Sequence, residues 1–169
     1  MIIAINRTYG NRYYTVGVMT VPGTEFKCKT LELRAPEHSS AVNKSKRHAV
    51  PCGDYKCYTI CTNLMIMTPR TGRIKGHGRA ILVGLERYQD LSQGQITICS
   101  SVNDNGRATI IPDIARALAN LIYEGHDAEG KDFDITLSIT EDINFHYDED
   151  ASELADSWSG SMDFTEDDE

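Results

Sequence analysis

The sequence predicts an α+β domain that is mainly β: a compact multi-stranded sheet or small barrel-like domain, with one helix in its C-terminal half and an acidic tail. Two observations support this fold class. Short runs rich in aromatic and β-branched residues recur along the chain and are separated by turn residues, which is typical of strands. A single segment, at about residues 113–123, places apolar residues at helical spacing.

The first strands are expected near the N-terminus. Residues 2–5 form a short strand, and residues 13–21 (YYTVGVMTV) form another that ends at the turn residues Pro22 and Gly23. Residues 25–33 alternate and complete a hairpin with the preceding strand. One face of this third strand carries Phe26, Cys28 and Thr30, and Glu32 is the next residue in this alternating series.

The rest of the chain alternates between strands and polar connections, apart from the helix. Residues 34–49 and 68–79 are basic, polar connections. Residues 50–54 (VPCGD) contain the proline, glycine and aspartate that are typical of a turn. Asp113 follows Pro112 and starts the helix, which should stop at Gly125. Further strands are expected at residues 55–61, 80–83, 95–99 and 133–139.

Charge divides the chain into a globular body and a tail. Residues 147–169 hold ten of the 25 acidic residues and none of the 17 lysines and arginines, so residues 1–146 are close to neutral. We therefore expect one globular domain over residues 1–146. The segment 147–169 is then an interaction tail or a disordered, solubilising tail.

The five cysteines favour a reducing compartment, the cytoplasm, and the alternative is a virion-associated protein. Their number is odd, and the N-terminus lacks the pattern of a signal peptide. No apolar run reaches the length of a membrane span, so no membrane partner is expected. Cys52, Cys57 and Cys61 lie near His48, but their spacing does not form the paired knuckles of a zinc site. We expect buried thiols, and no metal or other cofactor.

The two basic connections are candidates for contacts with an anion or a nucleic acid, because lysine and arginine track a phosphate backbone. The alternative is a pair of solvated loops. The Gly-rich stretch around His77 lacks the Lys-Ser/Thr that a phosphate loop requires. The candidate contacts are Lys44, Lys46, Arg47, Arg70, Arg73, Lys75 and Arg79.

The acidic tail contains apolar residues at regular intervals. Leu154, Trp158 and Met162 would share one face of a helix, and Phe164 follows two residues later. An acidic helix with an apolar stripe suits docking into a basic groove, so these four residues are a candidate surface for a protein partner. A purely solubilising tail is the alternative.

Motifs between Arg7 and Tyr55 resemble a domain family of unknown function from phages and gut bacteria. Its members carry a Y-T-x-G strand, an F-x-C-x-T-L-E strand and an I-P-x-G-x-Y turn. The matching stretches here are YTVG from Tyr14, FKCKTLE from Phe26 and VPCGDY from Val50. The resemblance extends over about residues 5–140. It implies a phage-type accessory domain that works in virion assembly or through another protein partner.

The same family carries an I-H-x-G-N strand and a G-C-I turn, whose His and Cys resemble the nucleophile pair of L,D-transpeptidase-like cell-wall enzymes. Here Leu82 stands in place of the His, Leu85 in place of the Asn, and Gln95, after Gly94, in place of the Cys. Leucine accepts no proton and glutamine is no nucleophile. The resemblance therefore implies a degenerate relative, a pseudoenzyme.

Three functions stay open at this point. The first is a non-enzymatic accessory, assembly or binding domain. The second is a cell-wall-active enzyme, either L,D-transpeptidase-like or lytic, that uses other residues such as Cys99. The third is a single-stranded nucleic-acid-binding protein whose basic face is shielded by the acidic tail. An enzyme needs a His close to a thiol, whereas a nucleic-acid-binding protein needs its two basic loops to converge.

Overall fold

The computed structural model describes residues 1–38, 48–60, 65–67, 80–83, 94–151 and 165–166, and it confirms the mainly β fold with a helix in the C-terminal half. Eight strands form one sheet in the order β6-β5-β4-β10-β1-β2-β3-β7. These strands are β1 (Ile2–Asn11), β2 (Tyr14–Thr20), β3 (Lys27–Leu33), β4 (Gly53–Ile60), β5 (Met65–Met67), β6 (Ala80–Val83), β7 (Thr97–Cys99) and β10 (Ile135–Asp148).

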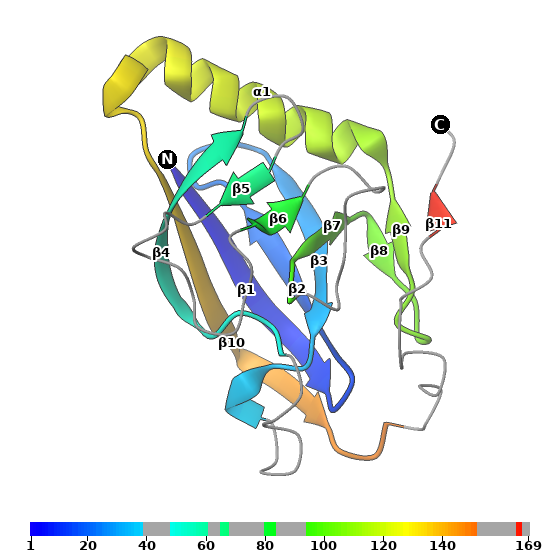
Figure 1. Ribbon diagram of the computed structural model, residues 1–169. Coiled ribbons are helices and arrows are strands. Elements are labelled where there is room, and N and C mark those ends of the chain that lie inside the picture. The colour runs from blue at the N-terminus through cyan, green and yellow to red at the C-terminus, as the bar shows by residue number, and fades with distance from the viewer. Residues whose placement is uncertain (39–47, 61–64, 68–79, 84–93, 152–164, 167–169) are drawn as a thin grey trace.

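The sheet curls like part of a barrel (Figure 1), and its two edge strands, β6 and β7, come into contact. The helix α1 (Pro112–Glu129) lies across one end of the curl. A smaller sheet is formed by β8 (Ser101–Val102), β9 (Ala108–Ile110) and β11 (Thr165–Glu166). Within the described part of the chain, no helix combines the length and apolar character needed to cross a membrane.

The main core lies between the inner face of the curled sheet and α1. Alternate residues of β1, Ile3 and Ile5, point inward together with Leu137 of β10, because successive side chains of a strand face opposite sides. Leu118 and Ile122 of α1 pack against them, and all five side chains are at most 2% exposed. This packing anchors one end of the sheet and leaves the other end to polar residues.

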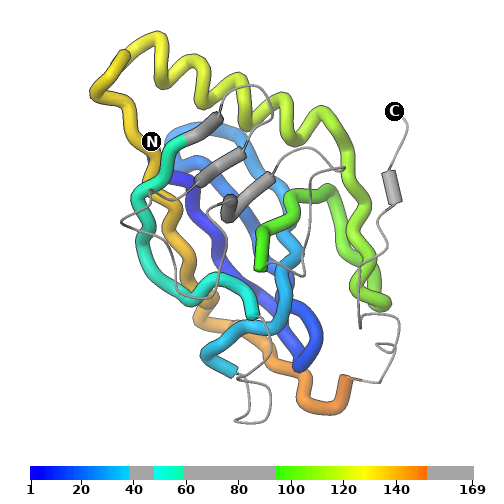
Figure 2. The backbone as a smooth tube through the Cα atoms, viewed as in Figure 1, coloured from blue at the N-terminus to red at the C-terminus, as the bar shows by residue number. Residues whose placement is uncertain are grey.

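A second, smaller core lies on the outer face of the sheet. Tyr14 and Leu31 of β2 and β3 pack there against Ala108 and Ile110 of β9, together with Cys99. Figure 2 shows the chain passing from β7 through the β8–β9 hairpin into α1. The sequence analysis did not predict this hairpin, because its strands are only two and three residues long.

The predicted end of the helix, near residues 123–125, is wrong: α1 continues through Gly125 to Glu129. A Cβ atom at Gly125 would lie 2.1 Å from Cε2 of Phe133, so the glycine makes room for this ring and does not end the helix. The helix instead stops at Gly130, whose φ of 57° is the left-handed conformation that favours glycine.

The two strands at the centre of the sheet are longer than the sequence predicted. β1 extends to Asn11 beyond the predicted residues 2–5, and β10 extends to Asp148 beyond the predicted 133–139. They run parallel and pair from Ile2–Thr136 to Asn11–Asp148. The predicted boundary between body and tail, after residue 146, therefore falls two residues before β10 ends. The connection predicted over residues 34–49 also contains a short 3₁₀ helix, η1 (Pro36–His38).

Candidate functional site

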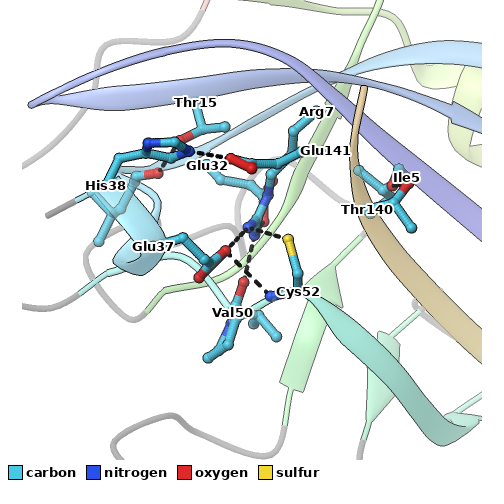
Figure 3. Close-up of polar contacts among 12 residues, drawn as sticks. Ile5, Arg7, Thr15, Glu32, Glu37, His38, Val50, Cys52, Thr140 and Glu141 are labelled. Atoms are coloured by element: carbon cyan, nitrogen blue, oxygen red, sulfur yellow. Dashed lines mark hydrogen bonds and ion pairs between the residues drawn. The ribbon is translucent and has the colours of Figure 1, made fainter. Parts of the chain in front are cut away.

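Two opposite charges are buried on the inner face of the sheet, beyond the apolar core (Figure 3). Arg7 of β1 donates from Nε to Oε2 of Glu32 at 3.0 Å and from Nη2 to Oε1 at 2.9 Å. Both side chains are 0% exposed. Removing two charges from water is costly, and this bidentate geometry offsets that cost only while both partners are present.

The guanidinium of Arg7 also ties the sheet to η1 and to the segment before β4. Nη1 donates to Oε1 of Glu37 at 3.1 Å and to Sγ of Cys52 at 3.6 Å, while Nη2 donates to the carbonyl of Val50. The five N–H donors of an arginine are thus all used. Burial alone would lower the pKa of Arg7, but the Glu32 carboxylate outweighs this and raises it. Arg7 is therefore a structural anchor, with no donor left for a ligand.

Cys52 is the half-buried member of this network. Its thiol accepts from Arg7, and its backbone N–H donates to Oε1 of Glu37 at 3.4 Å. Burial and the hydrogen bond to Glu37 raise the pKa of the thiol to about 11, although the charge of Arg7 acts in the opposite direction. The thiol therefore stays protonated at neutral pH and is a poor nucleophile.

His38, the last residue of η1, is fixed against the second half of β10. Its Nε2 pairs with Oε1 of Glu141 (Figure 3). Its ring stacks on Phe145, with centroids 4.9 Å apart, and on Tyr147, with centroids 5.1 Å apart. Gly10 of β1 leaves room for this cluster, because a Cβ atom there would lie 2.8 Å from Cζ of Phe145.

A bulge interrupts the pairing of β10 with β1 between Glu141 and His146. Four residues, 142–145, lie opposite the single residue Thr8 of β1. Asp142 holds the bulge in shape, since Asn6 donates to its Oδ1 at 2.8 Å and the backbone N–H of Asn144 donates to its Oδ2 at 3.0 Å. These two hydrogen bonds lower the pKa of Asp142. Bulges of this kind re-aim side chains at sheet edges and functional sites.

The bulge projects Ile143 into solvent. This side chain is 97% exposed, whereas the next most exposed large apolar residue of the described chain, Ile2, is 52% exposed. Together with His38, Glu141, Phe145 and Tyr147 it forms a surface that we call the β10 platform. Four acidic residues, Asp142, Asp148, Glu149 and Asp150, lie on the same stretch of chain, which has no lysine or arginine, while the charges of Arg12 and Arg34 act on Tyr147 from other segments.

Beside the platform, β10 has a neighbour on one side only among the described strands. β4 pairs with β10 over Ile135–Ile139, and beyond Ile139 the remaining pairing is with β1. An open edge invites a further strand, but a bulge interrupts the ladder that such a strand would need. The platform therefore favours side-chain docking over strand addition.

The positions of the degenerate family site come together only in part. Leu82 lies in β6, and Gln95, after Gly94, lies just before β7, the strand that β6 contacts. Leu85 lies outside the described residues. Cys99, the alternative nucleophile, is 0% exposed, donates to the carbonyl of Lys29 at 3.6 Å, and has a pKa raised to about 12 by burial.

The other described thiols have a similar environment. Cys28 and Cys57 are buried, and burial raises their pKa values to about 12 and about 11. In the described part of the chain, no group of three or more His, Cys, Asp or Glu side chains has the geometry to hold a metal ion. Cys61 lies outside it.

The remaining predicted site residues also lie outside the described residues. Both basic connections and the apolar stripe of the tail therefore stay predictions, as does their binding to nucleic acid or to a protein partner. These residues are Lys44, Lys46, Arg47, Arg70, Arg73, Lys75 and Arg79 of the connections, and Leu154, Trp158, Met162 and Phe164 of the tail.

Sequence reasoning missed the network around Arg7, although a signal was present. Arg7 continues the inward-facing series of Ile3 and Ile5, and Glu32 continues that of Cys28 and Thr30. Two opposite charges at core-facing positions of β1 and β3, the strands on either side of β2, indicate a buried ion pair. The bulge and Ile143 have no comparable local signal.

No protein-family model, curated protein or solved structure matches this chain. The candidate site therefore rests on its own geometry and chemistry.

Proposed function

We propose that the chain is a non-enzymatic binding domain that docks a protein partner on the β10 platform. The observation that carries the proposal is the 97% exposure of Ile143 on a bulge that two hydrogen bonds hold in place. Anchor residues that are already rigid lose little conformational freedom on binding, so more of their contact energy appears as affinity. The partner offers an apolar pocket for Ile143, rimmed by basic groups that face the acidic surroundings of the platform.

An accessory or assembly role is what the resemblance to a phage-type family implies for this binding. The alternative, a cell-wall-active enzyme, has less support. A thiol nucleophile needs a lowered pKa, and the pKa values of Cys28, Cys52, Cys57 and Cys99 are all raised. Docking through the acidic tail is compatible with the proposal, because the tail follows directly after β10.

The test compares three tagged forms of the full chain as bait in lysates of native or infected host cells. Wild type should recover a partner protein, and Ile143→Asp should lose it because a carboxylate cannot enter an apolar pocket. Tyr123→Asp is the matched control: Tyr123 is 43% exposed but lies on α1, so this variant should recover the partner as wild type does. Equal recovery by all three proteins would refute the proposal.

A muropeptide assay distinguishes the proposed binding domain from the alternative, a cell-wall-active enzyme. The purified protein should leave peptidoglycan fragments unchanged. Turnover that disappears in Cys99→Ser would overturn the non-enzymatic proposal and assign catalysis to this thiol.

A further inference from the structure

A groove lies at the end of the sheet opposite the β10 platform. It runs between the second half of α1, the start of β1 and the turn from β2 to β3, and its volume is about 340 Å³. Its apolar lining includes Ile2, Val21, Leu121 and Phe133. Ligand pockets have volumes of about 300–1,000 Å³, so this groove accommodates a small apolar group.

The groove is built on a close contact. Phe133 packs where a side chain at position 125 would stand, so Gly125 is required in the middle of α1. A glycine inside a helix costs about 1 kcal/mol relative to alanine. The ring of His126 also packs on Phe133, with centroids 4.4 Å apart. The floor of the groove is therefore fixed before any ligand arrives.

The charged side chains that line the groove are acidic, while the N-terminal ammonium of Met1, which also lines it, donates to the carbonyl of Asp134 at 3.0 Å. Glu124 and Glu129 line it, and no lysine or arginine does. Glu129 lies in the last turn of α1, where the helix dipole is negative and an acidic side chain is unfavourable. Residues that weaken local stability in this way are expected at functional positions. A cationic ligand would be attracted by both carboxylates and by the end of the helix.

We propose that this groove docks a protein segment that combines an apolar side chain with a neighbouring lysine or arginine. The apolar side chain packs against Phe133 and the half-exposed Ile2, while the cation pairs with Glu124 and Glu129. The groove lies away from the β10 platform, so the chain has two separate docking surfaces. A domain with a partner at each end serves as a connector.

The test uses a fluorescent amphipathic peptide of leucine and lysine, with the full-length protein. The peptide should bind, and the same peptide with glutamate in place of lysine should not. The double variant Glu124→Gln/Glu129→Gln should weaken binding about three- to tenfold, because each exposed ion pair contributes little and both are lost. Asp127→Asn is the matched control, since Asp127 lies on the same helix but does not line the groove.

Two further readouts distinguish this site from general attraction to an acidic protein. The NMR signals of Ile2, Leu121 and Phe133 should shift on titration with the peptide. Equal weakening by Asp127→Asn and by the glutamate double variant, or unshifted groove signals, would overturn the proposal. Ile143→Asp should leave peptide affinity unchanged, so failure here and failure of the β10 platform are separate results.

Discussion

Arg7 and Glu32 form a bidentate ion pair in which neither side chain is exposed to solvent. The pair joins β1 to β3, and the remaining donors of Arg7 hold Glu37, Val50 and Cys52. It thereby fixes η1, whose last residue, His38, belongs to the β10 platform and stacks on Phe145 and Tyr147. The candidate binding surface is thus supported by a buried charge network on the inner face of the sheet.

Replacing only one partner of the Arg7–Glu32 ion pair should strongly destabilise the fold. Arg7→Met and Glu32→Leu should each lower the free energy of unfolding by about 3–5 kcal/mol, because each leaves one buried charge without its partner. The double variant should recover most of this loss. Urea denaturation of the four proteins measures the three differences. Additive losses in the double variant would contradict a direct coupling of the two residues.

The bulge should loosen in acid. The hydrogen bonds from Asn6 and from the backbone of Asn144 lower the pKa of Asp142 below its ordinary value of 3.8. Its stabilising contribution is therefore complete above about pH 4 and is lost as the pH falls through the lower, folded-state pKa. The amide signal of Asn144, followed by NMR, should report this loss. In Asn6→Ala the transition should move to higher pH, and an unchanged titration would contradict the assignment.

Burial of thiols should make the protein sensitive to alkali. The pKa values of Cys28 and Cys99 are raised from an ordinary value of 9.0 to about 12. Their contribution to stability is fully present below about pH 9 and declines as the pH rises toward 12, because the unfolded chain loses these protons first. Thermal unfolding across this range should show a shallower decline in the Cys28→Ala/Cys99→Ala double variant. An equally steep decline would assign the alkaline sensitivity to other groups.

Gly125→Ala should destabilise the protein, although alanine is the better helix former. A methyl group would collide with the ring of Phe133, and overpacking of this kind costs about 1–3 kcal/mol. The Phe133→Ala background removes the ring, so there the same substitution should be neutral or stabilising. A stabilising Gly125→Ala in the wild-type background would show that the ring moves aside freely.

Local patterns in the sequence predict the sheet better than they predict the site. Alternation correctly placed Cys28 and Thr30 on one face of β3, which the structure shows to be the core face, and helical spacing located α1. Gly125 was misread as a helix stop, because its reason is the distant ring of Phe133. The bulge of β10 arises from pairing with β1, at the other end of the chain, and such register shifts leave no local trace.

The most direct test of partner binding through the β10 platform is the dissociation constant of the recovered partner, measured for wild type, Ile143→Asp and Tyr123→Asp at low salt. The account predicts a loss of at least about tenfold for Ile143→Asp, as for a central apolar anchor, and no change for Tyr123→Asp. Equal affinity of the wild type and Ile143→Asp, with both proteins folded, would contradict it.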